Sequence, residues 1–105
     1  MTYKNTNKPD ANKNKLVAYW REHGCTVVHM GVNAGFDLLL LSPTGAHIVE
    51  IKNPRRHWSY TPAENDMRAE CARLLIRYET ITNLVQAAYL IGDTDGVQKF
   101  LSDCS

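Results

Sequence analysis

The sequence predicts a small α/β domain around a mixed central sheet, with the element order helix, three strands, helix, strand, helix. Two observations support this prediction. Two strongly apolar runs, 36–41 and 46–51, flank the turn sequence Ser42-Pro43-Thr44-Gly45, and this arrangement is typical of a β-hairpin. A further apolar run at 86–91 follows a predicted helix, so a strand there joins the sheet by a crossover connection and makes the sheet mixed.

The first helix is predicted to begin after Pro9, with Asp10 as its N-cap, and to end at Gly24. Its larger apolar residues share roughly one helical face and are Leu16, Val17, Tyr19 and Trp20. The segment 25–30 is rich in β-branched residues, which predicts the first strand.

The second helix is predicted to start at a capping box, in which Thr61 is the N-cap and Glu64 reaches back to it. We expect this helix to run to about Tyr78 and the β-branched residues within 79–83 to break it. The run 86–91 is then predicted to be a buried strand. A short closing helix is predicted from apolar residues at helical spacing, which are Val97, Phe100, Leu101 and Cys104.

At 105 residues the chain is predicted to form one domain over 10–105, after a flexible, lysine-rich basic arm at 1–9. Hydrophobic residues make up 44% of the chain and charged residues 22%, so the composition is that of an ordinary globular protein. Because the formal net charge is only +1, the overall charge does not by itself indicate a nucleic-acid partner.

The three cysteines, Cys25, Cys71 and Cys104, are widely spaced, so neither a zinc site nor a disulfide framework is predicted. We therefore expect reduced thiols and a cytoplasmic location. No apolar run approaches the roughly 20 residues that cross a bilayer, and the polar N-terminus is unlike a signal peptide. No membrane association is predicted.

Three charged residues interrupt the apolar strands of the hairpin: Asp37, Glu50 and Lys52. A charge inside a buried strand is costly unless it is paired or binds a metal. Side chains alternate along a strand, so Glu50 and Lys52 share one face, and the turn places position 37 roughly across from position 50. The sequence therefore predicts that two carboxylates and one ammonium group meet at one point.

This group of charges suits a hard divalent cation. Mg2+ prefers oxygen ligands, usually one or two carboxylates with waters and substrate phosphate, and Asp37, Glu50 and the Ile51 carbonyl are predicted to supply them. Lys52 would lie beside the metal, where it orients a water and offsets charge on a phosphate. The simpler alternative is an internal salt bridge of Lys52 with one carboxylate, but three converging charges in two apolar strands favour the metal site.

Asp37 followed by Glu50-Ile51-Lys52 after a hairpin resembles the PD-(D/E)XK motif of the restriction-endonuclease-like nucleases. With the flanking segments 35–45 and Tyr60-Thr61-Pro62-Ala63-Glu64, the pattern is similar to the virus-type replication-repair nuclease (VRR-NUC) branch. Phe36 stands where that branch commonly has Pro, and Glu64 stands where Gln is usual. The resemblance covers residues 10–105 in element order, with its sharp motifs between 35 and 64.

The resemblance implies a restriction-endonuclease-like core and a Mg2+-dependent DNA endonuclease, with Mn2+ able to substitute. It implies that Asp37, Glu50 and the Ile51 carbonyl hold the metal and that Lys52 positions the attacking water, leaving a 5′-phosphate. Asp10 and Glu64 are accessory candidates, although the capping box gives Glu64 a structural role that we weigh more heavily. Small stand-alone relatives are often homodimers that cut branched DNA such as Holliday junctions. A chain this compact would also suit a phage or the cytosol of a bacterium.

A basic and aromatic segment directly follows Lys52. Arginines pair with phosphates and aromatic rings stack on unpaired bases. The candidate nucleic-acid contacts are Arg55, Arg56, His57, Trp58 and Tyr60, with Arg68 from the second helix. The alternative is a solvated loop whose aromatic residues pack onto the core, but its place at a strand end beside the metal site favours substrate binding.

Two rival hypotheses remain open. One is a catalytically silent protein of the nuclease fold that binds nucleic acid or inhibits another protein. The other is a small mixed α/β protein with a buried ion pair. The charges of Asp37, Glu50 and Lys52 inside a sheet favour the nuclease over both.

Overall fold

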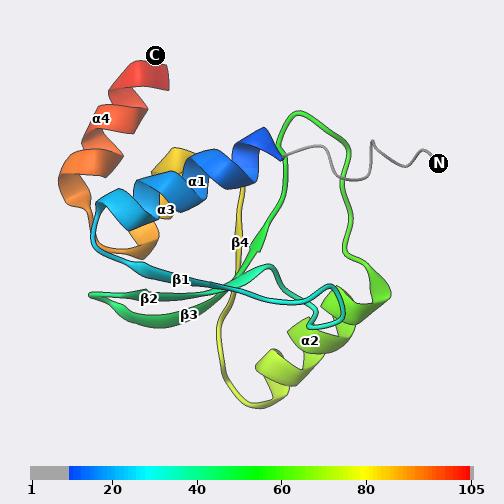
Figure 1. Ribbon diagram of the computed structural model, residues 1–105. Helices are drawn as coiled ribbons and strands as arrows, with labels where there is room; N and C mark the ends of the chain where they lie inside the picture. Colours follow the sequence, from blue (N-terminus) through cyan, green and yellow to red (C-terminus); the bar gives the residue numbers. More distant parts are fainter. Residues whose placement is uncertain (1–9, 105) are drawn as a thin grey trace.

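A computed structural model describes residues 10–104 and shows an α/β fold with one four-stranded sheet (Figure 1). The strands lie side by side in chain order: β1 (Thr26–His29), β2 (Leu38–Ser42), β3 (Gly45–Ile51) and β4 (Tyr78–Ile81). The helices are α1 (Ala11–Glu22), α2 (Pro62–Arg73), α3 (Leu84–Leu90) and α4 (Thr94–Cys104). The first three strands are antiparallel and β4 runs parallel to β3, so the predicted mixed sheet is confirmed.

Helix α1 begins as predicted, because the Asp10 side chain accepts a hydrogen bond from the Lys13 backbone N–H at 3.1 Å. After the helix ends, Gly24 adopts a φ of 81°, which suits a glycine at a helix C-terminus. The buried face carries Trp20, which is 0% exposed and donates its indole N–H to the Ala87 carbonyl at 3.1 Å. This bond joins α1 to α3.

The hairpin of β2 and β3 has the predicted turn and register. Ser42 pairs with Gly45 and Leu38 pairs with Val49, so position 37 lies across from position 50. The Asp37 backbone N–H continues the ladder by donating to the Val49 carbonyl at 3.0 Å.

One face of the sheet forms the main core of the protein. Its buried side chains are Leu38, Leu40, Val49, Ile51 and Ile81, and they pack with Leu16, Trp20 and Ala87 of the helices. Figure 1 shows α1 and α3 together on this side of the sheet and α2 on the other side. The two faces are therefore covered by different helices.

The second helix is shorter than predicted. Helix α2 ends at Arg73 rather than near Tyr78, and Leu75 follows it with a φ of 62°. A positive φ at a residue with a side chain stops a right-handed helix, since the next residue cannot continue the helical path. The capping box at Thr61 and Glu64 is confirmed.

The predicted positions of the last strand and the break before it were wrong. Strand β4 occupies Tyr78–Ile81, so it overlaps the predicted break at 79–83. The predicted strand at 86–91 lies mostly in helix α3. Asn83 starts this helix by accepting the Gln86 backbone N–H at 2.9 Å. The apolar run therefore forms part of a helix, which buries Ala87 and Ala88. The predicted element order did not include this helix.

Gly35 brings the start of the hairpin against α2. Its φ is 86°, and a Cβ placed there would lie 2.6 Å from the Ala63 carbonyl oxygen and 2.8 Å from the Met67 Cβ. Tyr78 also reaches this loop, because its hydroxyl donates to the Gly35 carbonyl at 2.7 Å. Glycine therefore permits the close approach that places α2 beside Asp37.

The closing helix α4 is confirmed, and Asp93 stabilises its start by accepting the Gly96 N–H at 3.0 Å. The basic arm predicted for 1–9 lies outside the described residues. Within residues 10–104 no helix combines the length and apolar character needed to cross a membrane.

Candidate active site

Asp37, Glu50 and Lys52 lie on the sheet face opposite the main core. Leu38 and Val49 point into the core, so the alternation of side chains directs Asp37 and Glu50 to the other face. The Asp37 carboxylate also accepts the Ile51 backbone N–H at 2.7 Å. The hairpin register thus fixes two carboxylates next to each other, as the sequence predicted.

Lys52 connects the hairpin to α2 through a buried ion triad. Its Nζ lies 3.2 Å from Glu50 Oε2 and 2.8 Å from Glu64 Oε1. The Lys52 side chain is only 12% exposed and the Glu64 side chain 14%. At these distances and this burial the ammonium is held between two carboxylates rather than freely hydrated.

Glu64 has two roles in this arrangement. Its Oε1 accepts the Thr61 N–H at 3.0 Å in the capping box and also accepts from Lys52 Nζ. The capping box orients the carboxylate at the helix start, so the helix cap and the site share one side chain. The sequence predicted the cap and named Glu64 as an accessory candidate, and the structure brings both features together.

The start of α1 lies beside the site, which the sequence reasoning missed. Asn12 Nδ2 donates to the Lys52 carbonyl at 3.0 Å and to the Thr82 carbonyl at 3.2 Å. Lys13 Nζ lies 3.6 Å from Asp37 Oδ1. Asp10, the accessory candidate, instead caps α1. These contacts join residues far apart in the chain, and no local pattern in the sequence indicates them.

The electrostatics of the site centre on Glu50. Burial, the negative charge of Asp37 and the neighbouring Glu64 carboxyl raise the pKa of Glu50 to about 8, although its bond with Lys52 opposes the rise. Burial alone lowers the pKa of Lys52, but the hydrogen bonds to Glu64 and Glu50 outweigh it and the net pKa is raised. Burial raises the pKa of Glu64, but the bonds from Lys52 and Thr61 outweigh it and the net pKa is lowered.

The donor set fits a hard divalent cation. Three carboxyl groups, Asp37, Glu50 and Glu64, gather about two ammonium groups, Lys13 and Lys52, so the cluster is rich in oxygen donors. In residues 10–104 no group of three or more His, Cys, Asp or Glu side chains is arranged to hold a metal ion. Mg2+ needs only one or two carboxylates, because waters and substrate oxygens complete its shell. Asp37 and Glu50 could supply these carboxylates.

Aromatic side chains line the other side of Lys52. Its Nζ lies 5.6 Å from the Tyr60 ring centre and 5.9 Å from the Trp58 ring centre. The Tyr60 hydroxyl is bonded to the Thr80 hydroxyl at 2.8 Å, and Arg68 lies 3.9 Å above the Tyr60 ring. Tyr60 is therefore held in place, while Trp58 remains 38% exposed and presents a ring surface beside the site.

The remaining basic candidates lie in the loop between β3 and α2. Arg55, Arg56 and His57 are exposed, and the turn they occupy is closed by the Arg55 backbone N–H donating to Asn53 Oδ1 at 2.9 Å. They follow Lys52 in the chain and, among the described residues, make no ion pair with Glu50 or Glu64. Their position leaves them accessible to a large ligand.

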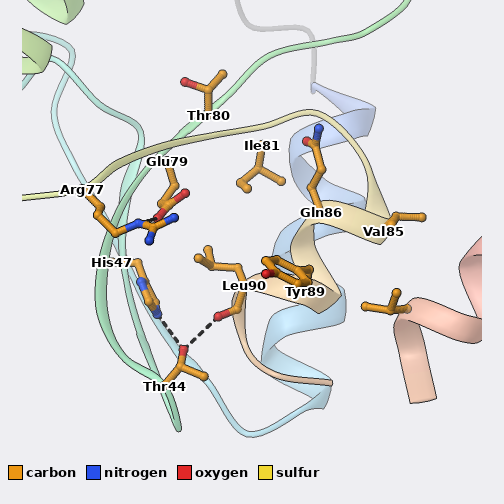
Figure 2. A pocket seen from close by; sticks show the side chains of 11 residues that line it. Thr44, His47, Arg77, Glu79, Thr80, Ile81, Val85, Gln86, Tyr89 and Leu90 are labelled. Atoms are coloured by element: carbon orange, nitrogen blue, oxygen red, sulfur yellow. Dashed lines mark hydrogen bonds and ion pairs between the residues drawn. The ribbon is translucent and has the colours of Figure 1, made fainter. Parts of the chain in front are cut away.

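A hollow of about 620 Å³ lies away from the ion triad, between α3 and the hairpin end of the sheet (Figure 2). There His47 is hydrogen-bonded to the Thr44 hydroxyl at 2.7 Å, and the Thr44 hydroxyl donates to the Leu90 carbonyl at 2.8 Å. His47 pairs with Leu40 and so lies on the core side of β3, away from Glu50. The hollow and the charged cluster are separate features.

Comparison of the chain with models of known protein families, with curated proteins and with solved structures found no match. The functional inference therefore depends on the site geometry.

Proposed function

We propose that this protein is a metal-dependent DNA endonuclease with a restriction-endonuclease-like core, most similar to a small stand-alone VRR-NUC domain. The supporting observation is the convergence of Asp37, Glu50 and Lys52 on one sheet face, with position 37 across from position 50. A purely structural sheet gains nothing from three charges there, because burying them is costly.

In the proposed reaction, water attacks a phosphodiester phosphorus and the bond to the 3′ oxygen breaks, leaving a 5′-phosphate and a 3′-hydroxyl. Asp37, Glu50 and the Ile51 carbonyl would hold Mg2+ or Mn2+, which when bound supplies a Lewis acid for the phosphate. Lys52 orients the water and offsets charge on the phosphate from its fixed position between Glu50 and Glu64.

The loop after β3 is the proposed contact for DNA. Arg55 and Arg56 are exposed and can pair with phosphates, and the exposed Trp58 ring can stack on an unpaired base. Tyr60 and Arg68 support this surface from beneath, because Arg68 packs on the Tyr60 ring. Branched DNA, including Holliday junctions, presents unpaired bases and bent backbones that such a loop can reach, and a homodimer would cover two arms.

The test compares wild type with Lys52→Met on four-way junction, flap, single-stranded and duplex DNA, each with Mg2+, Mn2+ or EDTA. We expect metal-dependent cutting by wild type and a loss of at least about 100-fold in rate for the variant. Lys99→Met, which changes a lysine on α4, is the matched control. Absence of cutting by wild type on every substrate, with DNA binding retained, would refute the nuclease proposal.

A silent binding module of the same fold is the second candidate, and one observation favours it. The protein itself gives Lys52 two carboxyl partners, Glu50 and Glu64, so the lysine has a purely structural role available to it. Such a module would bind nucleic acid or protein through the same exposed loop and would show no metal-dependent cutting.

A further inference from the structure

Glu64 differs in kind from the other acidic residues of the site. Asp37 and Glu50 come from the hairpin, whereas Glu64 comes from the first turn of α2. Its carboxylate is oriented by the Thr61 N–H and makes the shorter of the two contacts to Lys52, 2.8 Å against 3.2 Å for Glu50. Lys52 is thus anchored more closely to the helix than to the proposed metal ligand.

This geometry has a consequence for cation binding. A divalent cation at Asp37 and Glu50 and the Lys52 ammonium both need Glu50 as a partner. If Glu50 were the only carboxylate near Lys52, the ammonium and the metal would compete for it. Glu64 gives the ammonium a second, pre-oriented carboxylate, so Glu50 can turn to the cation while Lys52 stays in place.

On the basis of the function proposed above, we propose that Glu64 is a positioning residue that retains Lys52 when a divalent cation binds at Asp37 and Glu50. It acts through Lys52 and is not itself a metal ligand. Without the Glu64 charge, Lys52 would pair with Glu50 alone and compete with the cation for that carboxylate. Removing the charge should therefore weaken metal binding.

The experiment measures Mn2+ affinity by calorimetry in the absence of DNA for wild type, Glu64→Gln, Lys52→Met and the double variant. Gln preserves an acceptor for the Thr61 N–H, so the helix cap survives, and thermal unfolding verifies the fold of each variant. We expect Glu64→Gln to weaken Mn2+ binding about tenfold, the size typical of a residue that supports a metal ligand. Glu70→Gln removes the same charge from an exposed position on α2 and is the matched control.

The Lys52→Met background identifies how Glu64 acts, because interacting residues are non-additive. We expect the Glu64→Gln effect to fall below about twofold when Lys52 is absent. An unchanged affinity in Glu64→Gln would overturn the inference and leave Glu64 as a helix cap. An equal loss in both backgrounds would also overturn it, because Glu64 would then act on the metal directly. If wild type binds no Mn2+, the proposed function itself fails.

Discussion

The two faces of the central sheet differ in character: one carries the apolar core and the other carries the charged cluster. The face under α1 and α3 carries Leu38, Val49 and Ile51, all buried, and packs against Trp20. The face toward α2 carries Asp37, Glu50 and Lys52 at the same end of the same strands. Because successive side chains alternate, one hairpin supplies a dry core on one side and a charged cluster on the other.

In this small protein, charged side chains on the sheet are buried because the helices supply partners for them. Each charge on the α2 face has a partner from another element, including Glu64 from α2 and Lys13 from α1. Among the described residues, every buried side-chain nitrogen or oxygen has a hydrogen-bond partner. Packing on the core face holds α1 against the sheet. The ion pairs of the charged face form only when α1 and α2 are in these positions.

The largest expected effect is on the core face. Trp20→Ala should lower the free energy of unfolding by about 3–5 kcal/mol, because it empties a fully buried site and removes the bond to Ala87. Chemical denaturation measures the change. A loss below about 1 kcal/mol would show that α1 does not hold the core in this way.

The second effect tests the charged face through pH. A folded-state pKa of about 8 for Glu50, against 4.5 for the free group, means that its contribution to stability is complete below pH 4.5 and is lost as pH rises through 8. The slope over that window is at most about 1.4 kcal/mol per pH unit.

Glu50→Gln should therefore flatten the fall of unfolding free energy between pH 4.5 and 8, measured by urea denaturation without divalent metal. Glu70→Gln, on the exposed surface of α2, should leave the slope unchanged. Equal slopes in wild type and Glu50→Gln would contradict the buried, charge-crowded state of Glu50.

A smaller effect is expected at the contact between Gly35, at the start of the hairpin, and helix α2. Gly35→Ala should cost about 1–3 kcal/mol, because the residue has a positive φ and its Cβ would strike the Ala63 carbonyl. Gly24→Ala is the matched control, since Gly24 has a similar φ of 81° and no atom within 4 Å of the added Cβ. If both variants lose equal stability, the packing of α2 on Gly35 contributes nothing.

The smallest effect on stability is expected at Trp58. Trp58→Ala should leave the unfolding free energy within about 0.5 kcal/mol of wild type, because the ring is partly exposed in a loop. It should weaken binding to single-stranded DNA by about 1–3 kcal/mol if the ring stacks on a base. Fluorescence anisotropy measures the binding, and undiminished affinity would remove Trp58 from the proposed DNA surface.

Local sequence determined the hairpin and the central part of the site. The turn at 42–45 and the alternation of β3 suffice to put Asp37, Glu50 and Lys52 on one face, and the Thr61 capping box is readable from four adjacent residues. These features depend on neighbours in the chain, so their geometry follows from strand and helix periodicity.

Tertiary structure decided the rest. Whether 86–91 forms a strand or a helix depends on Ala87 and Ala88 packing against α1, since a short apolar run fits either state. The partners of the charges are also nonlocal: Lys52 reaches Glu64, and Lys13 approaches Asp37, because helices α1 and α2 approach one site from opposite sides of the sheet. Periodicity specifies which face a side chain occupies, but only the packed helices determine what it meets there.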